Sequence, residues 1–179
     1  MLKWSRRRLV ARLVRLLVVV LLPATGCADP YERYADVVHE DVDAALLAAL
    51  RMTARVQLTV VHNQIPDDSL SVVVDAASGA AREAWNRARH FAAVTPPPDL
   101  AELHANLSAE LFNLAHALDA MGATLRRCAD SRDSSGKACQ AHLAELAARF
   151  GFVGEDLNMA RSRVQRALLP HGVLLRRVA

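Results

Sequence analysis

The sequence predicts an all-α fold, an antiparallel up-down four-helix bundle whose C-terminal helical hairpin carries a disulfide. Alanine, leucine and arginine are abundant in the 179 residues, whereas glycine (7 residues) and aromatic residues (4%) are few, and this composition favours helices over sheets. After about residue 30, apolar residues recur every three or four positions in four stretches. Short polar segments separate these stretches, as expected for helices that alternate in direction around one core.

The first two helices are predicted over about residues 31–62 and 70–94. The apolar face of the first consists of Tyr34, Val38, Val42, Ala45, Ala49, Met52, Val56 and Val60. The apolar face of the second consists of Leu70, Val73, Ala77, Ala81, Trp85 and Ala88. Residues 63–69 contain Pro66 followed by three residues that favour helix starts, so we expect a turn there.

A β-hairpin over residues 56–74 is the alternative for the same region. Apolar residues stand at every second position at 56, 58 and 60 and again at 70, 72 and 74, and most of them are β-branched. We favour long helices because the three-four spacing continues beyond both ends of the region.

The third and fourth helices are predicted over residues 99–128 and 139–168. Prolines 96–98 followed by Asp99 suit a helix start, where an acidic side chain interacts favourably with the helix dipole. The third apolar face consists of Leu100, Leu103, Leu107, Leu111, Leu114, Leu118, Met121, Leu125 and Cys128. The fourth consists of Cys139, Leu143, Leu146, Phe150, Val153, Leu157, Ala160, Val164 and Leu168. Both faces have the spacing of closely packed helices.

Two further features of this hairpin follow from its residues. Gly151 and Gly154 weaken the middle of the last helix, so we expect a kink or short break there. Residues 129–138 form a polar, turn-rich linker. Cys128 and Cys139 lie on the apolar faces at either side of this linker and therefore face each other in an antiparallel hairpin. We predict a disulfide between them, because the hairpin can bring their Cα atoms to about 5.5–6 Å.

The first 26 residues have the three parts of a secretory signal. They contain six basic residues and no acidic one, then an uncharged apolar run over residues 16–22, then small residues before Cys27. The run is far shorter than the roughly 20 residues of a membrane-spanning helix. We therefore expect residues 1–26 to be a cleaved signal peptide rather than a transmembrane anchor or an amphipathic helix on the membrane surface.

Residues 24–27, Ala-Thr-Gly-Cys, resemble the lipobox of bacterial lipoproteins, although Ala24 stands where that class usually has leucine. The resemblance implies that the Cys27 thiol receives a diacylglyceryl group and that the chain is cut just before it. Residues 27–179 would then form a single helical domain attached to a membrane through lipidated Cys27. In that class an aspartate after the cysteine is associated with retention in the inner membrane, so the resemblance implies, from Ala28, the periplasmic side of the outer membrane in a cell with two membranes. Residues 5–10 also resemble the twin-arginine export motif, which is the alternative to the general export route that we favour.

The charge of the chain changes once the signal is removed. The chain has 22 basic and 19 acidic residues, and six of the basic ones lie in residues 1–26, which leaves 16 against 19, a net charge of −3. A nucleic-acid-binding domain needs a basic surface on its folded part. We therefore expect no nucleic-acid partner.

The sequence contains no recognisable catalytic or metal-binding motif. None of the seven histidines has another histidine three or four residues away, and there is no Gly-x-Ser-x-Gly sequence, phosphate-binding glycine loop or Cys-x-x-Cys-His sequence. We therefore expect no catalytic residue, metal or cofactor, and a binding or structural role in the cell envelope, with a possible protein partner there. The alternative is a small-ligand or metal carrier that uses the bundle interior or a cluster of His104, His116 and His142.

Overall fold

The computed structural model describes residues 29–61, 67–130 and 137–175, and within these ranges every regular element is helical, with no strand. The chain divides into two units, Met1–Pro30 and Tyr31–Ala179, and the second unit contains the helical bundle. The predicted all-α four-helix architecture is confirmed.

The first long helix contains an irregular turn in its middle. Helix α2 (Pro30–Val37), the π-helical turn η1 (Val38–Asp43) and α3 (Ala44–Val61) follow one another without a gap. The bounds agree with the helix predicted over 31–62. The π-helical turn was not predicted.

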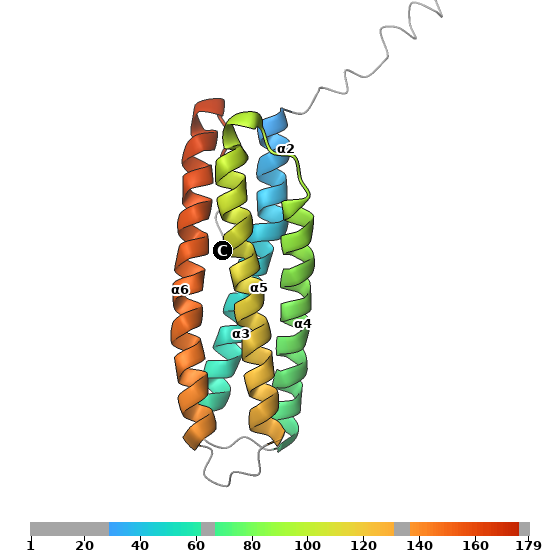
Figure 1. The fold of residues 1–179 in the computed structure, drawn as a ribbon, viewed down its shortest axis with the longest axis vertical. Coiled ribbons are helices and arrows are strands. Elements are labelled where there is room, and N and C mark those ends of the chain that lie inside the picture. Colours follow the sequence, from blue (N-terminus) through green and yellow to red (C-terminus); the bar gives the residue numbers. More distant parts are fainter. Residues whose placement is uncertain (1–28, 62–66, 131–136, 176–179) are drawn as a thin grey trace, which may run out of the picture. The chain divides into compact units, whose positions relative to one another are not determined.

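The remaining elements complete an antiparallel bundle (Figure 1). They are α4 (Asp67–Ala92), the 3-10 turn η2 (Pro98–Leu100), α5 (Ala101–Asp130), α6 (Lys137–Leu168) and the 3-10 turn η3 (Leu169–His171). Helix α5 packs against both α4 and α6, and α3 packs mainly against α4. Helix α5 therefore lies between α4 and α6 in the bundle.

The alternative β-hairpin over residues 56–74 is wrong. Residues 56–61 belong to α3 and residues 67–74 to α4, while 62–66 lie outside the described residues. Met52 and Val56 are buried on one side of the turn, and Val73 and Ala77 on the other. Residues four positions apart lie on the same face of a helix, so each pair contributes to the buried face of its own helix.

The break expected near Gly151 and Gly154 is also not present, because α6 runs uninterrupted from Lys137 to Leu168. Each glycine in a helix costs roughly 1 kcal/mol relative to alanine. Phe150 and Leu157, on either side of the two glycines, are buried in the core. Burying a side chain of that size contributes about 1.5–3 kcal/mol, which offsets the cost of the glycines.

The core follows the predicted apolar faces. Helix α5 supplies half of the twelve largest fully buried side chains in the described residues. These six are Leu107, Leu111, Leu114, Leu118, Met121 and Leu125. Leu157, Val164 and Leu168 of α6 and Phe91 of α4 pack into the same cluster. Trp85 is only partly buried and contacts Phe112 of α5 at 5.7 Å between ring centroids.

Candidate functional site

The most unusual polar feature of the bundle is a pair of buried carboxylates in the π-helical turn η1. Asp41 and Asp43 are both buried, and Asp43 is only 1% exposed. Removing a carboxylate from water costs several kcal/mol unless charged or polar partners replace the lost hydration. π-helical turns such as η1 occur frequently at functional sites. Both carboxylates have charged or polar partners in the neighbouring helices.

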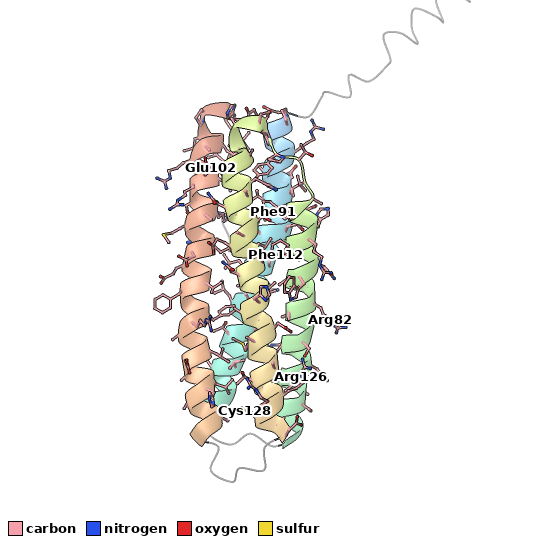
Figure 2. The ribbon with its side chains drawn as sticks, in the orientation of Figure 1. Arg82, Phe91, Glu102, Phe112, Arg126 and Cys128 are labelled. Atoms are coloured by element: carbon pink, nitrogen blue, oxygen red, sulfur yellow. A yellow bond between two sulfur atoms is a disulfide. The ribbon has the colours of Figure 1, made fainter. Side chains whose placement is uncertain are left out.

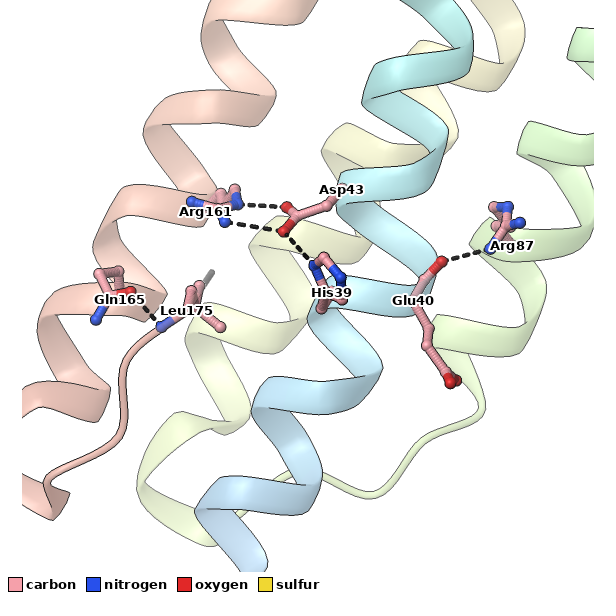
Figure 3. A network of polar contacts seen from close by, with 7 residues as sticks. All are labelled: His39, Glu40, Asp43, Arg87, Arg161, Gln165 and Leu175. Atoms are coloured by element: carbon pink, nitrogen blue, oxygen red, sulfur yellow. Dashed lines mark hydrogen bonds and ion pairs between the residues drawn. The ribbon is translucent and has the colours of Figure 1, made fainter. Parts of the chain in front are cut away.

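Asp43 is paired with helix α6. The Arg161 guanidinium donates two hydrogen bonds to the Asp43 carboxylate, from Nε to Oδ1 and from Nη2 to Oδ2, the second at 2.9 Å (Figure 3). The Nδ1 atom of His39 lies 3.1 Å from Oδ2 of the same carboxylate. The side chain of Arg161 is itself only 11% exposed. This two-bond ion pair joins η1 to α6 across the bundle.

Asp41 is paired with helix α4 on the other side of the same turn. His90 Nδ1 donates to Asp41 Oδ2 at 2.6 Å, and Arg87 Nη1 lies 4.0 Å from Oδ1. Arg87 also donates to the main-chain oxygen of Glu40 and to the carboxylate of Glu83. The hydrogen bond and the negative charge of Asp41 raise the pKa of the exposed His90 imidazole.

Tyr34 of α2, one helical turn before the start of η1, forms a buried pair with His104 of α5. The Tyr34 hydroxyl and His104 Nδ1 lie 3.3 Å apart, and the Phe91 ring contacts His104 at 4.6 Å between centroids. Burial raises the pKa of the Tyr34 hydroxyl and lowers the pKa of His104. Both groups are therefore neutral at pH 7, and His104 behaves as a hydrogen-bonded core histidine.

The structure does not bring together the histidine cluster of the alternative hypothesis. His104 and His116 are twelve residues apart on α5, which corresponds to about 18 Å along a helix. His104 contacts Tyr34, whereas His116 lies edge-on to the Trp85 ring at 4.6 Å, and His142 is exposed on α6. Within residues 29–61, 67–130 and 137–175, no group of three or more His, Cys, Asp or Glu side chains is placed to hold a metal ion.

A shallow groove runs between α5 and α6. Its volume is about 400 Å³. Its lining includes the apolar side chains of Ala117, Phe150 and Val153 together with the polar and charged side chains of Glu110, His116, Arg149 and Asp156. The groove offers contact area for a small molecule, with apolar and charged groups side by side.

The predicted disulfide is confirmed. Cys128 of α5 and Cys139 of α6 are bonded, with their Cα atoms 5.5 Å apart. Cys128 lies near the end of α5 that precedes the linker (Figure 2). The predicted lipidation site, Cys27, lies outside the described residues. No helix in the described part of the chain is long and apolar enough to cross a bilayer.

Sequence reasoning missed the η1 network. Arg161 directly follows Ala160 on the apolar face of α6, and Asp41 and Asp43 flank Val42 on the apolar face of the first helix. Opposite charges on two apolar faces were the available signal. Recognising a pair among them requires knowing which residues lie at the same height in the bundle.

The chain was compared with protein families, curated proteins and solved structures, and none of them matches it.

Proposed function

We propose that this chain is an exported lipoprotein, anchored through acylated Cys27, whose helical bundle has a binding or structural role in the cell envelope rather than a catalytic one. The observation that carries the proposal is the position of Cys27, directly after a basic segment, an apolar run and three small residues. The resemblance of residues 24–27 to the lipobox implies the modification. In a cell with two membranes, the anchor is expected at the periplasmic side of the outer membrane.

The use of the three cysteines supports this proposal. Cys128 and Cys139 form the disulfide between α5 and α6, so Cys27 is the one cysteine that remains for acylation. Disulfides persist in extracytoplasmic compartments and are rare in the cytosol of most organisms. Export is therefore consistent with both modifications.

The arrangement of the bundle supports a binding or structural role. The two carboxylates of η1 form ion pairs with neighbouring helices, Asp43 with Arg161 of α6 and Asp41 with His90 of α4. These pairs hold the helices in register, which is a structural role. The surfaces left for function are the outer faces and ends of the bundle, where an envelope protein would bind.

Metabolic labelling with an alkyne analogue of palmitate tests the proposal. The native host would express the full chain, Cys27→Ser, and the control Cys128→Ser/Cys139→Ser, which removes the disulfide and keeps Cys27. We expect label in the wild type and in the control, and its loss in Cys27→Ser. Equal labelling of all three proteins, or none in the wild type, would contradict the proposal.

The groove between α5 and α6 favours one second candidate, a carrier of a small ligand. Its lining combines the Arg149 guanidinium and the His116 imidazole with apolar side chains. Elemental analysis and native mass spectrometry of protein purified from the envelope would test it. A stoichiometric metal or co-purifying small molecule would favour the carrier, and apo protein of unmodified mass apart from the anchor would favour the first proposal.

A further inference from the structure

One end of the bundle is fastened by three side chains from different elements. The Tyr31 ring of α2 stacks on the His171 ring of η3, with centroids 3.5 Å apart. The Tyr31 hydroxyl donates to Asp99 Oδ1 of η2 at 3.0 Å, and His171 Nε2 lies 3.5 Å from Asp99 Oδ2. The first turn of α2 is therefore held against η3, the segment that follows the last helix.

Exposed apolar side chains surround this contact on the η3 side. Leu169 in η3 is 50% exposed, its neighbour Pro170 is exposed, and Leu174 is 71% exposed. We call Leu169, Pro170 and Leu174 the anchor-end patch. Leu169 and Leu174 are two of the six large apolar side chains that are exposed in the described part of the chain, and Leu174 is the most exposed of the six.

Leu174 is held outward by specific contacts. The segment after η3 turns back along α6, where Leu175 N donates to Gln165 Oε1 at 2.6 Å (Figure 3). Gln165 Nε2 also donates to Val173 O at 3.5 Å. Val173 and Leu175 are consequently buried. Successive side chains of an extended segment point in opposite directions, so Leu174 between them points into solvent.

The sequence places this end of the bundle next to the proposed anchor. Tyr31 is four positions after Cys27, and an extended chain over four positions spans at most about 14 Å. Acyl chains on Cys27 would therefore keep the Tyr31 end close to the membrane surface. Two leucines bind a bilayer weakly on their own, but a short tether makes the contact intramolecular and raises its effective concentration.

We propose that the anchor-end patch contacts the interfacial region of the phospholipid membrane that carries the Cys27 lipid; this inference rests on the proposed lipid anchor. Its apolar side chains enter the headgroup boundary, and the Tyr31 ring, apolar with a polar hydroxyl, suits the same depth. The charged side chains of this region are of both signs, with Arg166 against Glu32 and Asp99, so the contact does not depend on anionic lipid. The opposite end of the bundle, which carries the disulfide, then points away from the membrane.

The test uses the full chain, lipidated in the host and reconstituted into phosphatidylcholine vesicles with brominated acyl chains, which quench nearby tryptophan. The reporter is Leu174→Trp in a Trp85→Phe background. The matched control is Val72→Trp in the same background, because Val72 is 63% exposed near the start of α4, at the disulfide end of the bundle. We expect a blue shift and quenching of the Leu174→Trp emission and neither for Val72→Trp.

Flotation of the same vesicles separates the two proposals. Protein that does not float with lipid contradicts the anchor itself. Protein that floats while Leu174→Trp is quenched no more than Val72→Trp overturns the membrane contact and leaves the anchor standing. A blue shift without quenching in these vesicles would also overturn it, because a protein surface rather than lipid would then cover the patch.

Discussion

At the scale of single residues, the Asp43–Arg161 pair is the contact on which the register of the bundle most depends. Asp43 has no access to water that could replace Arg161, and Arg161 is itself largely buried. Breaking a buried pair by removing one partner leaves an uncompensated charge. Removing both partners together avoids that cost, so the pair serves the alignment of η1 and α6 more than total stability.

Asp43→Ala should lower the free energy of unfolding by about 3–5 kcal/mol, because it leaves the Arg161 charge buried. Urea unfolding followed by circular dichroism measures the change. The control Asp36→Ala, at an exposed position of α2, should stay within about 0.5 kcal/mol of the wild type. The double variant Asp43→Leu/Arg161→Met should recover most of the loss. A loss below about 1 kcal/mol in Asp43→Ala would refute the role of the pair.

The pKa values of His90 and His104 should be shifted in opposite directions from the ordinary value of 6.5. Asp41 raises the pKa of His90, so the stability that His90 contributes is complete below pH 6.5 and is lost as pH rises through its folded-state pKa. Burial lowers the pKa of His104, so its contribution is present above pH 6.5 and is lost as pH falls through its folded-state pKa.

NMR titration of the imidazole resonances measures both values. The variant Asp41→Asn should return the pKa of His90 toward 6.5 and leave His104 unchanged, since His104 does not contact Asp41. A His90 pKa at or below 6.5 in the wild type would show that the Asp41 contact is not formed in solution.

At the scale of elements, α6 retains a helix through two glycines that have no packing role. A Cβ atom built on Gly151 or Gly154 meets no other atom within 4 Å. Gly151→Ala and Gly154→Ala should therefore each stabilise the protein by roughly 0.5–1 kcal/mol, because alanine favours the helix. Gly172 follows η3 with φ of +74°, so Gly172→Ala should destabilise by about 1–2 kcal/mol. Thermal unfolding of the three variants gives the signs, and destabilisation by either α6 variant would contradict the packing described.

The disulfide should stabilise the α5–α6 hairpin through the short loop that it closes. Cys128 and Cys139 are eleven residues apart, and closing a loop of this size is worth about 3 kcal/mol. Cys128→Ala/Cys139→Ala should lose stability of that order, and adding reductant to the wild type should produce the same loss. Equal stability of oxidised and reduced protein would mean that the hairpin is held by its core alone.

How much of each element could be predicted depended on whether its determinants are local. The four helices were predictable because residues such as Leu107, Leu111 and Leu114 repeat at the spacing that buries one face. The disulfide was predictable because the two cysteines flank one short linker. The π-helical turn was not, because steps of four between Tyr34, Val38 and Val42 fit an α-helix equally well. Its partners in α4 and α6 are 49 and 118 residues away in the sequence.

At the scale of the whole molecule, the proposed lipid anchor sets how the bundle is oriented relative to the membrane. The proposed lipid on Cys27 holds one end of the bundle, where Tyr31, Asp99 and His171 fasten the first turn of α2 to η3. Helix α5, with 30 residues, extends about 45 Å, so the disulfide end stands well away from the lipid. The groove between α5 and α6 then faces sideways, accessible to a partner in the envelope.

Intact-mass analysis of the protein extracted from native membranes tests the central claim most directly. The account predicts one species that begins at Cys27, carries acyl chains on that residue, and is two hydrogens lighter than the reduced polypeptide because of the Cys128–Cys139 bond. Fragmentation would locate the lipid on the first residue. A membrane-bound species that retains residues 1–26, or one without acyl mass on Cys27, would contradict it.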